Sequence, residues 1–94
     1  MPVEKISLGQ LVRSKAGRDR GQVYLVVGFA EISLLLLANG RDRKVTKPKK
    51  KNIRHISVLK SIDKGVAAKI ACDQAATDEE IRHAISAWIN TGEE

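Results

Sequence analysis

Short segments of alternating apolar and polar residues run through the first 60 residues, a pattern that is typical of β-strands. The clearest is GQVYLVVGF (residues 21–29), where Val23, Leu25 and Val27 share one parity and β-branched residues are abundant. Four further segments have strand-like composition: residues 8–14, 32–38, 43–47 and 53–60. Five short strands with a turn every 8–12 residues or so predict a mainly β protein, built as a small antiparallel barrel.

The segment ISLLLLA (residues 32–38) is apolar at nearly every position, which suits a strand buried on both faces and also suits a helix. The Asn39-Gly40 pair that follows favours the strand, because both positions tolerate the positive φ angles of a tight hairpin. The next strand is expected to run from Arg43 to Lys47 and to stop at Pro48, which lacks an amide donor.

Beyond residue 60 the apolar positions take the period of a helix. Thr77 is a favourable N-cap, and Glu80 three residues later completes a capping box. An apolar stripe follows at helical spacing: Ile81, Ala84, Ile85, Trp88 and Ile89. We therefore expect an amphipathic helix over residues 77–91. Its stripe either packs on the barrel or docks a partner protein, and packing is favoured because the barrel's own core is small.

Residues 61–76 connect these two parts. Ile62, Val66 and Ile70 are four residues apart, which would allow a helical turn or two, but Gly65 and the lack of clear caps argue against a helix. The expected organisation is a barrel over residues 1–60, a linker of low order over 61–76 and a helix over 77–91.

Charge divides the chain in the same place. The 94 residues carry a net charge of +6, yet residues 13–60 hold 13 basic and 3 acidic residues, whereas residues 61–94 hold 3 basic and 7 acidic residues. A surface that serves only solubility mixes its signs, and the basic half does not. The basic half therefore predicts a polyanionic partner.

Two segments concentrate the basic residues. In SKAGRDRG (residues 14–21), Gly17 and Gly21 permit a tight turn that could present amides and guanidinium groups to phosphate. By local pattern alone, a plain hairpin turn with solvated charges is the favoured alternative. In RDRKVTKPKKKNIR (residues 41–54), each cation that meets a phosphate would release a counterion. A solvated or disordered loop, or a localisation-type signal, is the alternative there.

These segments are expected to form two lips of one binding surface. Arg13, Lys15, Arg18 and Arg20 form the first lip, and Lys47, Lys49, Lys50, Lys51 and Arg54 form the second. The full set of candidate RNA-binding residues is Arg13, Lys15, Gly17, Arg18, Arg20, Gly21, Arg43, Lys47, Lys49, Lys50, Lys51, Arg54 and His55. Asp19 is expected to orient the first loop.

Other chemistry is poorly represented in the sequence. Aromatic residues are scarce, and with Phe29 and Trp88 expected in the core, only Tyr24 is left as a surface residue for base stacking. Recognition of the shape and backbone of folded RNA is therefore expected. His55, His83 and the lone Cys72, expected to be a partly buried filler, form no metal-ligand pattern, and no catalytic pair, triad or phosphate loop stands out. We expect no enzyme activity, no cofactor, no membrane segment and a cytoplasmic location.

GQLVRSKAGRDRGQVYLVVG (residues 9–28) resembles the KOW motif, in which a basic glycine-containing loop joins two strands. With AGRD at residues 16–19, Asn39-Gly40, PKKKN at residues 48–52 and His55, the chain is similar to KOW-domain ribosomal proteins of the archaeal and eukaryotic large subunit, the eukaryotic-type L-fourteen, L-six and L-twenty-seven group, and to their short bacterial relatives.

The resemblance covers about residues 7–60. It implies an SH3-like barrel that binds ribosomal RNA through the loop between its first two strands. Elongation factors of transcription also carry KOW motifs, so a protein-interaction module of the transcription or translation machinery stays the alternative. The chain departs from the ribosomal group after Lys60, where an acidic amphipathic helix replaces their long basic helices.

Overall fold

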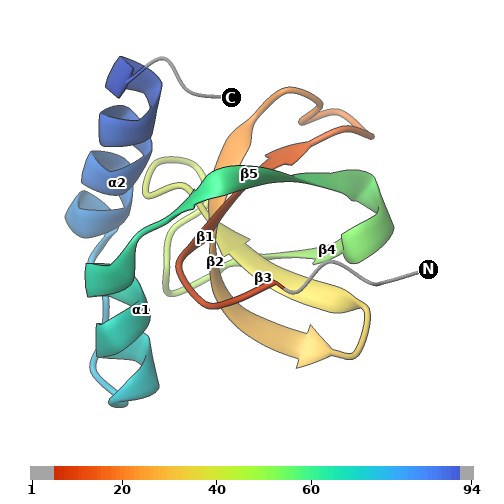
Figure 1. Ribbon diagram of the computed structural model, residues 1–94. Helices are drawn as coiled ribbons and strands as arrows, with labels where there is room; N and C mark the ends of the chain where they lie inside the picture. The colour runs from red at the N-terminus through yellow and green to blue at the C-terminus, as the bar shows by residue number, and fades with distance from the viewer. Residues whose placement is uncertain (1–5, 92–94) are drawn as a thin grey trace.

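Strands precede helices along the chain, as the residue pattern predicts (Figure 1). The computed structural model describes residues 6–91. The strands are β1 (Gln10–Ser14), β2 (Val23–Glu31), β3 (Leu34–Ala38), β4 (Lys49–Asn52) and β5 (Ile56–Ile62). A single 3-10 turn, η1 (Ile53–His55), joins β4 to β5, and the helices α1 (Lys64–Ala71) and α2 (Asp78–Thr91) follow.

The five strands form one antiparallel sheet in the order β4-β3-β2-β1-β5. Within residues 6–91 no pairing joins β4 to β5, so the ladder is open at these two edge strands. The mainly β fold with a C-terminal helix is confirmed. Closure into an SH3-like barrel is not shown by the pairing and stays a prediction, and the first five residues of the expected barrel lie outside the described part.

Each face of the sheet carries its own apolar cluster. Six buried side chains form the inner cluster on one face: Val12, Tyr24, Val26, Leu35, Leu37 and Ile56. The outer cluster joins the opposite face to the helical part: Leu11, Leu25, Ala38, Leu59, Val66, Ala76, Ile81, Ala84 and Trp88. Figure 1 shows both helices on this outer side, with the strands curving away from them. Burial on both faces explains why β2 and β3 have nearly continuous apolar sequences.

The apolar stripe of α2 packs on the sheet rather than standing away from it. Ile81, Ala84 and Trp88 are buried in the outer cluster and Ile85 packs against it, whereas Ile89 stays 57% exposed. The capping box before the helix is confirmed. The Glu80 amide donates to Thr77 Oγ1 at 3.1 Å, and the Thr77 amide donates to Glu80 Oε1 at 2.9 Å.

Replacing Thr77 with alanine is expected to lower the free energy of unfolding by about 1 kcal/mol, because the cap bond to the Glu80 amide is lost. Urea unfolding followed by circular dichroism measures the change. Thr46, which is exposed in the loop between β3 and β4, supplies the matched control. Thr46→Ala should shift stability by less than about 0.5 kcal/mol. Equal losses for the two variants would contradict the capping role.

Two expectations about the middle of the chain are wrong. The fourth strand occupies Lys49–Asn52 instead of residues 43–47, so it follows Pro48 rather than ending at it. Asn39-Gly40 does not form a tight hairpin either. Residues 39–48 form a ten-residue connection, and the tight turn of the sheet lies at Ile32-Ser33, between β2 and β3. The lysine side chains of β4 lack the apolar alternation by which a strand is recognised.

Residues 61–76 contain the end of β5 and helix α1, so the expectation of a linker of low order is wrong. The Asp63 side chain caps α1 by accepting a hydrogen bond from the Val66 amide at 2.9 Å. Val66 is buried in the outer cluster, and Gly65 lies on the exposed side of the helix. Capping and packing together outweigh the low helix propensity of one glycine.

Two of the three side chains expected in or near the core lie elsewhere. Trp88 is buried as predicted, but Phe29 is 50% exposed near the end of β2. The last three residues of that strand are all exposed. The end of β2 therefore extends beyond the two apolar clusters, and Phe29 lies in this uncovered part. Cys72, expected to be a partly buried filler, is exposed at the C-cap of α1.

Candidate nucleic-acid interface

The connection between β1 and β2 (residues 15–22, the β1–β2 loop) is held in a compact shape by its glycines and main-chain hydrogen bonds. Gly17 has φ +87° and Gly21 has φ +93°, values that residues with a Cβ rarely adopt. The Gly21 amide donates to Ser14 O at 2.8 Å, and the Gln22 amide donates to Asp19 O at 2.9 Å. The prediction that the two glycines shape the turn is confirmed.

Asp19 points into the protein and organises the loop. Its side chain is only 11% exposed. Its Oδ1 accepts hydrogen bonds from Ser14 Oγ at 2.9 Å and from Lys51 Nζ at 2.7 Å. Its Oδ2 accepts one from the Tyr24 hydroxyl at 2.9 Å and lies 3.2 Å from Lys49 Nζ. Asp19 does orient the loop, and its cationic partners are lysines of β4 rather than the arginines beside it.

The ionisation of this network follows from its burial and its hydrogen bonds. Burial raises the pKa of Asp19, but hydrogen bonds from Lys51, Tyr24, Ser14 and Lys49 outweigh burial and hold that pKa well below its usual value. Burial raises the pKa of Tyr24, and the hydrogen bond to the Asp19 carboxylate and its charge raise it further. At neutral pH the network therefore contains a charged carboxylate and a protonated phenol.

Lys51 belongs to this network and not to the surface. It is 8% exposed, and its Nζ also donates to Ala16 O at 2.8 Å. In the ladder Lys51 lies opposite Leu35 and Lys49 opposite Leu37, so both side chains share the face of the inner cluster. The prediction that the Lys51 ammonium contacts RNA is therefore wrong, because that group is buried against the loop.

The other cations of the β1–β2 loop lie outside. Lys15, Arg18 and Arg20 are exposed, and no carboxylate of the described chain forms an ion pair with them. The Lys15 amide donates to His55 O at 2.9 Å, which places exposed Arg54 and His55 of η1 beside the loop. The single acid of the loop is thus neutralised inside while its basic side chains face solvent.

The connection between β3 and β4 (residues 39–48, the β3–β4 loop) is folded around the Asn39 side chain. Asn39 Oδ1 accepts from the amides of Arg41 at 2.9 Å and Arg43 at 3.0 Å. Asn39 Nδ2 donates to Asp42 Oδ1 at 2.8 Å, and this bond lowers the pKa of Asp42. The asparagine therefore replaces the expected hairpin turn with a longer side-chain-centred turn.

Helix α2 fixes the same loop from outside. The Val45 amide donates to Asp78 Oδ1 at 2.7 Å, and Arg82 Nη1 donates to Gly40 O at 2.6 Å. Gly40 has φ +76° and lies so close to the helix that a Cβ there would overlap the main-chain oxygen of Asp78. The first turn of α2 and the β3–β4 loop are consequently one packed unit.

The structure separates the predicted site residues into two groups. Ten lie exposed at the two loops, β4 and η1: Lys15, Gly17, Arg18, Arg20, Gly21, Arg43, Lys47, Lys50, Arg54 and His55. The remaining three are less accessible. Lys51 is buried, Lys49 is half-buried beside Asp19, and the Arg13 guanidinium lies 5.5 Å from the ring centroid of Trp88. Arg13 therefore belongs to the face of β1 that α2 covers.

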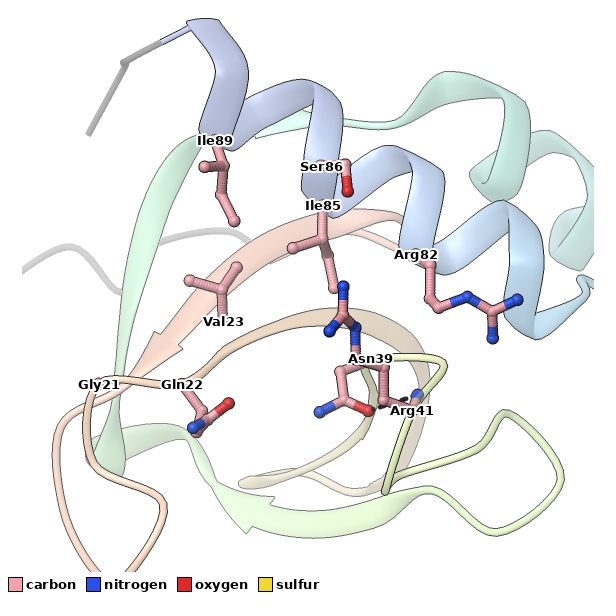
Figure 2. A pocket seen from close by; sticks show the side chains of 9 residues that line it. All are labelled: Gly21, Gln22, Val23, Asn39, Arg41, Arg82, Ile85, Ser86 and Ile89. Carbon is pink, nitrogen blue, oxygen red and sulfur yellow. Dashed lines mark hydrogen bonds between the residues drawn. The ribbon is translucent and has the colours of Figure 1, made fainter.

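Sequence reasoning missed Arg82. In an antiparallel sheet the β1–β2 and β3–β4 connections leave from the same end, and α2 passes beside both. Arg82 and Arg41 line a hollow of about 310 Å³ between these loops and the helix (Figure 2). In the sequence Arg82 directly follows Ile81 of the apolar stripe, a position that indicates only a polar residue beside that stripe on α2. Arg82 lies near Arg41 because α2 packs beside the β3–β4 loop, and no local pattern predicts that packing.

Comparison with models of known protein families finds no match for this chain, and comparison with curated protein sequences finds none either. Among residues 6–91, no three histidine, cysteine or acidic side chains lie together as potential metal ligands. None of the helices in that range has both the length and the apolar character needed to cross a bilayer.

Proposed function

We propose that this chain is a non-catalytic RNA-binding protein that contacts the phosphate backbone of structured RNA through its basic loops. The β1–β2 loop supplies Lys15, Arg18 and Arg20, and the β3–β4 loop supplies Arg41 and Arg43 from the same end of the sheet. Phosphate contacts of this kind position a protein on RNA without reading base sequence. The scarcity of exposed aromatic side chains also favours recognition of shape and backbone.

The observation that carries the proposal is the opposite orientation of neighbouring charges in the β1–β2 loop. Asp19 is directed inward to Lys49 and Lys51, while Arg18 and Arg20 on either side of it are exposed. A loop whose acid is neutralised internally presents a one-signed surface, and its arginines are held on a rigid turn. Such preorganised guanidinium groups suit phosphate oxygens.

The finer part of the proposal follows the sequence resemblance. We assign the strand order and the intervening η1 to an SH3-like barrel of the KOW type, and we take ribosomal RNA as the partner. The resemblance to ribosomal KOW proteins in residues 16–19 and 48–52 supports both assignments. The packing of α2 on the sheet supports a role for this helix inside the domain.

Reversing both Arg18 and Arg20 to glutamate is expected to weaken binding of a structured ribosomal RNA fragment by at least about tenfold, because two phosphate contacts become repulsive. Wild-type affinity should fall with salt at a log–log slope of about −3.5 to −4.5, which corresponds to about five phosphate contacts. The slope of the double variant should be shallower by about two. Filter binding or fluorescence anisotropy over a salt series measures both quantities.

Lys60→Glu with Lys64→Glu is the matched control, because both lysines are exposed and the change in net charge is the same. β5 runs antiparallel to β1, so its end and the start of α1 lie at the opposite end of β1 from the β1–β2 loop. Equal losses for the two double variants would show a diffuse charge effect and not a loop contact. A wild-type slope near zero would contradict RNA binding altogether and favour a protein partner.

A further inference from the structure

The hollow between the two loops and α2 combines cationic groups with an apolar wall. Val23, Ile85 and Ile89 form the apolar side, and Arg41 and Arg82 lie at its margin. Figure 2 shows the Arg41 side chain rising from the β3–β4 loop toward Ile85, with Val23 and Ile89 farther along the hollow. A plain phosphate site would not need the apolar wall, and an apolar ligand would not need the guanidinium groups. The combination suits an amphipathic anion.

The polar groups around the hollow are not equally available to a ligand. The Asn39 side chain already has partners: its Oδ1 accepts hydrogen bonds from the main-chain amides of Arg41 and Arg43, and its Nδ2 donates one to Asp42. Arg82 donates one N–H to Gly40 O, and its guanidinium points away from the apolar wall (Figure 2). The side chains of Gln22 and Ser86 are exposed. A ligand would therefore meet one cationic group, Arg41, with one amide and one hydroxyl.

The size and position of the hollow suit a single nucleotide unit. Its volume of about 310 Å³ lies at the lower end of ligand pockets, which run from roughly 300 to 1,000 Å³. It begins at Gly21, directly after Arg20, and a Cβ placed on Gly21 would meet no other atom within 4 Å. An RNA backbone held by the β1–β2 loop could thus continue over Gly21 into the hollow.

We propose that this hollow receives one unpaired nucleotide of the bound RNA, with its base against Val23, Ile85 and Ile89 and its phosphate at Arg41. The inference rests on the proposed RNA binding and extends it, because it assigns a preference for RNA that carries an extruded base. Proteins accept such bases in pockets of apolar side chains and read their edges with hydrogen bonds. Gln22 and Ser86 are placed to supply those bonds.

The test compares two RNA hairpins that differ only in one bulged 2-aminopurine nucleotide, at one fixed salt concentration. Wild-type protein is expected to bind the bulged hairpin about tenfold more tightly than the paired hairpin, because the apolar wall removes the face of one base from water. The fluorescence of the 2-aminopurine should change on binding, because its base leaves water for the hollow. Free AMP is titrated in parallel to separate a nucleotide within RNA from a mononucleotide ligand.

Two variants probe the hollow itself. Ser86→Leu places a larger side chain at its helix side and should reduce the preference to less than about twofold, with the affinity for the paired hairpin unchanged within about twofold. His83→Leu is the control on the same helix, because His83 is exposed and does not line the hollow, and it should retain the preference. Arg41→Gln removes a guanidinium group without altering the helix and should also abolish most of the preference.

Equal wild-type affinities for the two hairpins would overturn the inference and leave the RNA-binding proposal standing. A preference that survives both Ser86→Leu and Arg41→Gln would place the extruded base elsewhere and would also overturn it. Binding of free AMP that depends on Arg41, with no preference between hairpins, would replace it with a mononucleotide site. Failure to bind either hairpin would contradict the proposed function, and this inference with it.

Discussion

Replacing Asp19 with asparagine is expected to lower the free energy of unfolding by about 3 kcal/mol, because Lys51 then keeps a buried ammonium without its carboxylate. A domain of this size has a total stability on the order of 5–15 kcal/mol, so the loss is a large fraction of it. The β1–β2 loop should also loosen, since Ser14 and Tyr24 lose the charged acceptor of their hydrogen bonds. Urea unfolding at pH 7 measures the first effect and hydrogen exchange of the loop amides the second.

The same substitution should change how stability depends on pH. The pKa of Asp19 in the folded protein lies below its usual value of about 3.9. Its stabilising contribution is therefore fully present above about pH 4 and is lost as the pH falls below 4 toward the folded-state pKa. Wild-type stability should consequently decline more steeply below pH 4 than that of Asp19→Asn.

Asp42→Asn is the matched control for Asp19→Asn. Asp42 is exposed, and its carboxylate accepts one hydrogen bond from Asn39, so its replacement should cost much less stability than the replacement of Asp19. The double variant Asp19→Asn/Lys51→Met should be more stable than the sum of its single losses predicts, because it removes both partners of the buried pair. Equal losses at positions 19 and 42 would contradict a special role for the buried carboxylate.

Replacing Gly40 with alanine is expected to destabilise the protein by about 2–4 kcal/mol. The positive φ angle of +76° costs a residue with a Cβ about 1–2 kcal/mol, and the new methyl group would also overlap the main-chain oxygen of Asp78. Relief of that overlap requires the β3–β4 loop to move away from α2, which should break the hydrogen bonds to Val45 and Arg82. Unfolding curves and amide chemical shifts of these residues report the two effects.

Gly21→Ala separates the two causes, because Gly21 shares the positive φ angle but has open space around it. Its loss of stability should be limited to the conformational cost of about 1–2 kcal/mol. If Gly40→Ala is no more destabilising than Gly21→Ala, close packing of the loop against α2 does not contribute to stability.

The features that the sequence predicts well are those whose signal is local and repeated. The alternation in residues 21–29 predicts β2, and the capping box with its apolar stripe predicts α2 to within one residue at its start. Both elements also carry the residues of the main clusters, so that pattern and packing agree. Consistency between local preference and tertiary burial is what makes an element predictable.

The features that the sequence misses depend on partners far along the chain. Lys51 lies within a run of lysines that resembles a solvated loop, and only its pairing with Leu35 and its bond to Asp19, 32 residues earlier, make it part of a buried strand. Tyr24 is the aromatic residue that we expect at the surface, yet it is only 2% exposed. Its hydroxyl can be buried because it donates a hydrogen bond to the Asp19 carboxylate, and no local sequence pattern predicts such a pair.

The candidate site also combines local features with contacts between distant residues. The glycines and exposed arginines of the β1–β2 loop could be identified from their composition, because a basic turn needs only neighbouring residues. Arg82 could not, since its proximity to Arg41 requires α2 to pack beside the β3–β4 loop. Asp63 lies between these two cases. An aspartate before a helix is a local N-cap signal, but Gly65 lowers the helix propensity of the same segment and argues against a helix there.

The attachment of α2 to the β3–β4 loop also means that the strands alone would lack part of the packing around the candidate site. A fragment that stopped after β5 would expose Leu11 and Leu25 on the outer face and leave the Val45 amide without the Asp78 carboxylate. The β3–β4 loop would keep the hydrogen bonds of Asn39 and lose its contacts with α2. The acidic helix is therefore an integral part of the fold, and its Asp78 carboxylate holds in place a loop that carries exposed arginines.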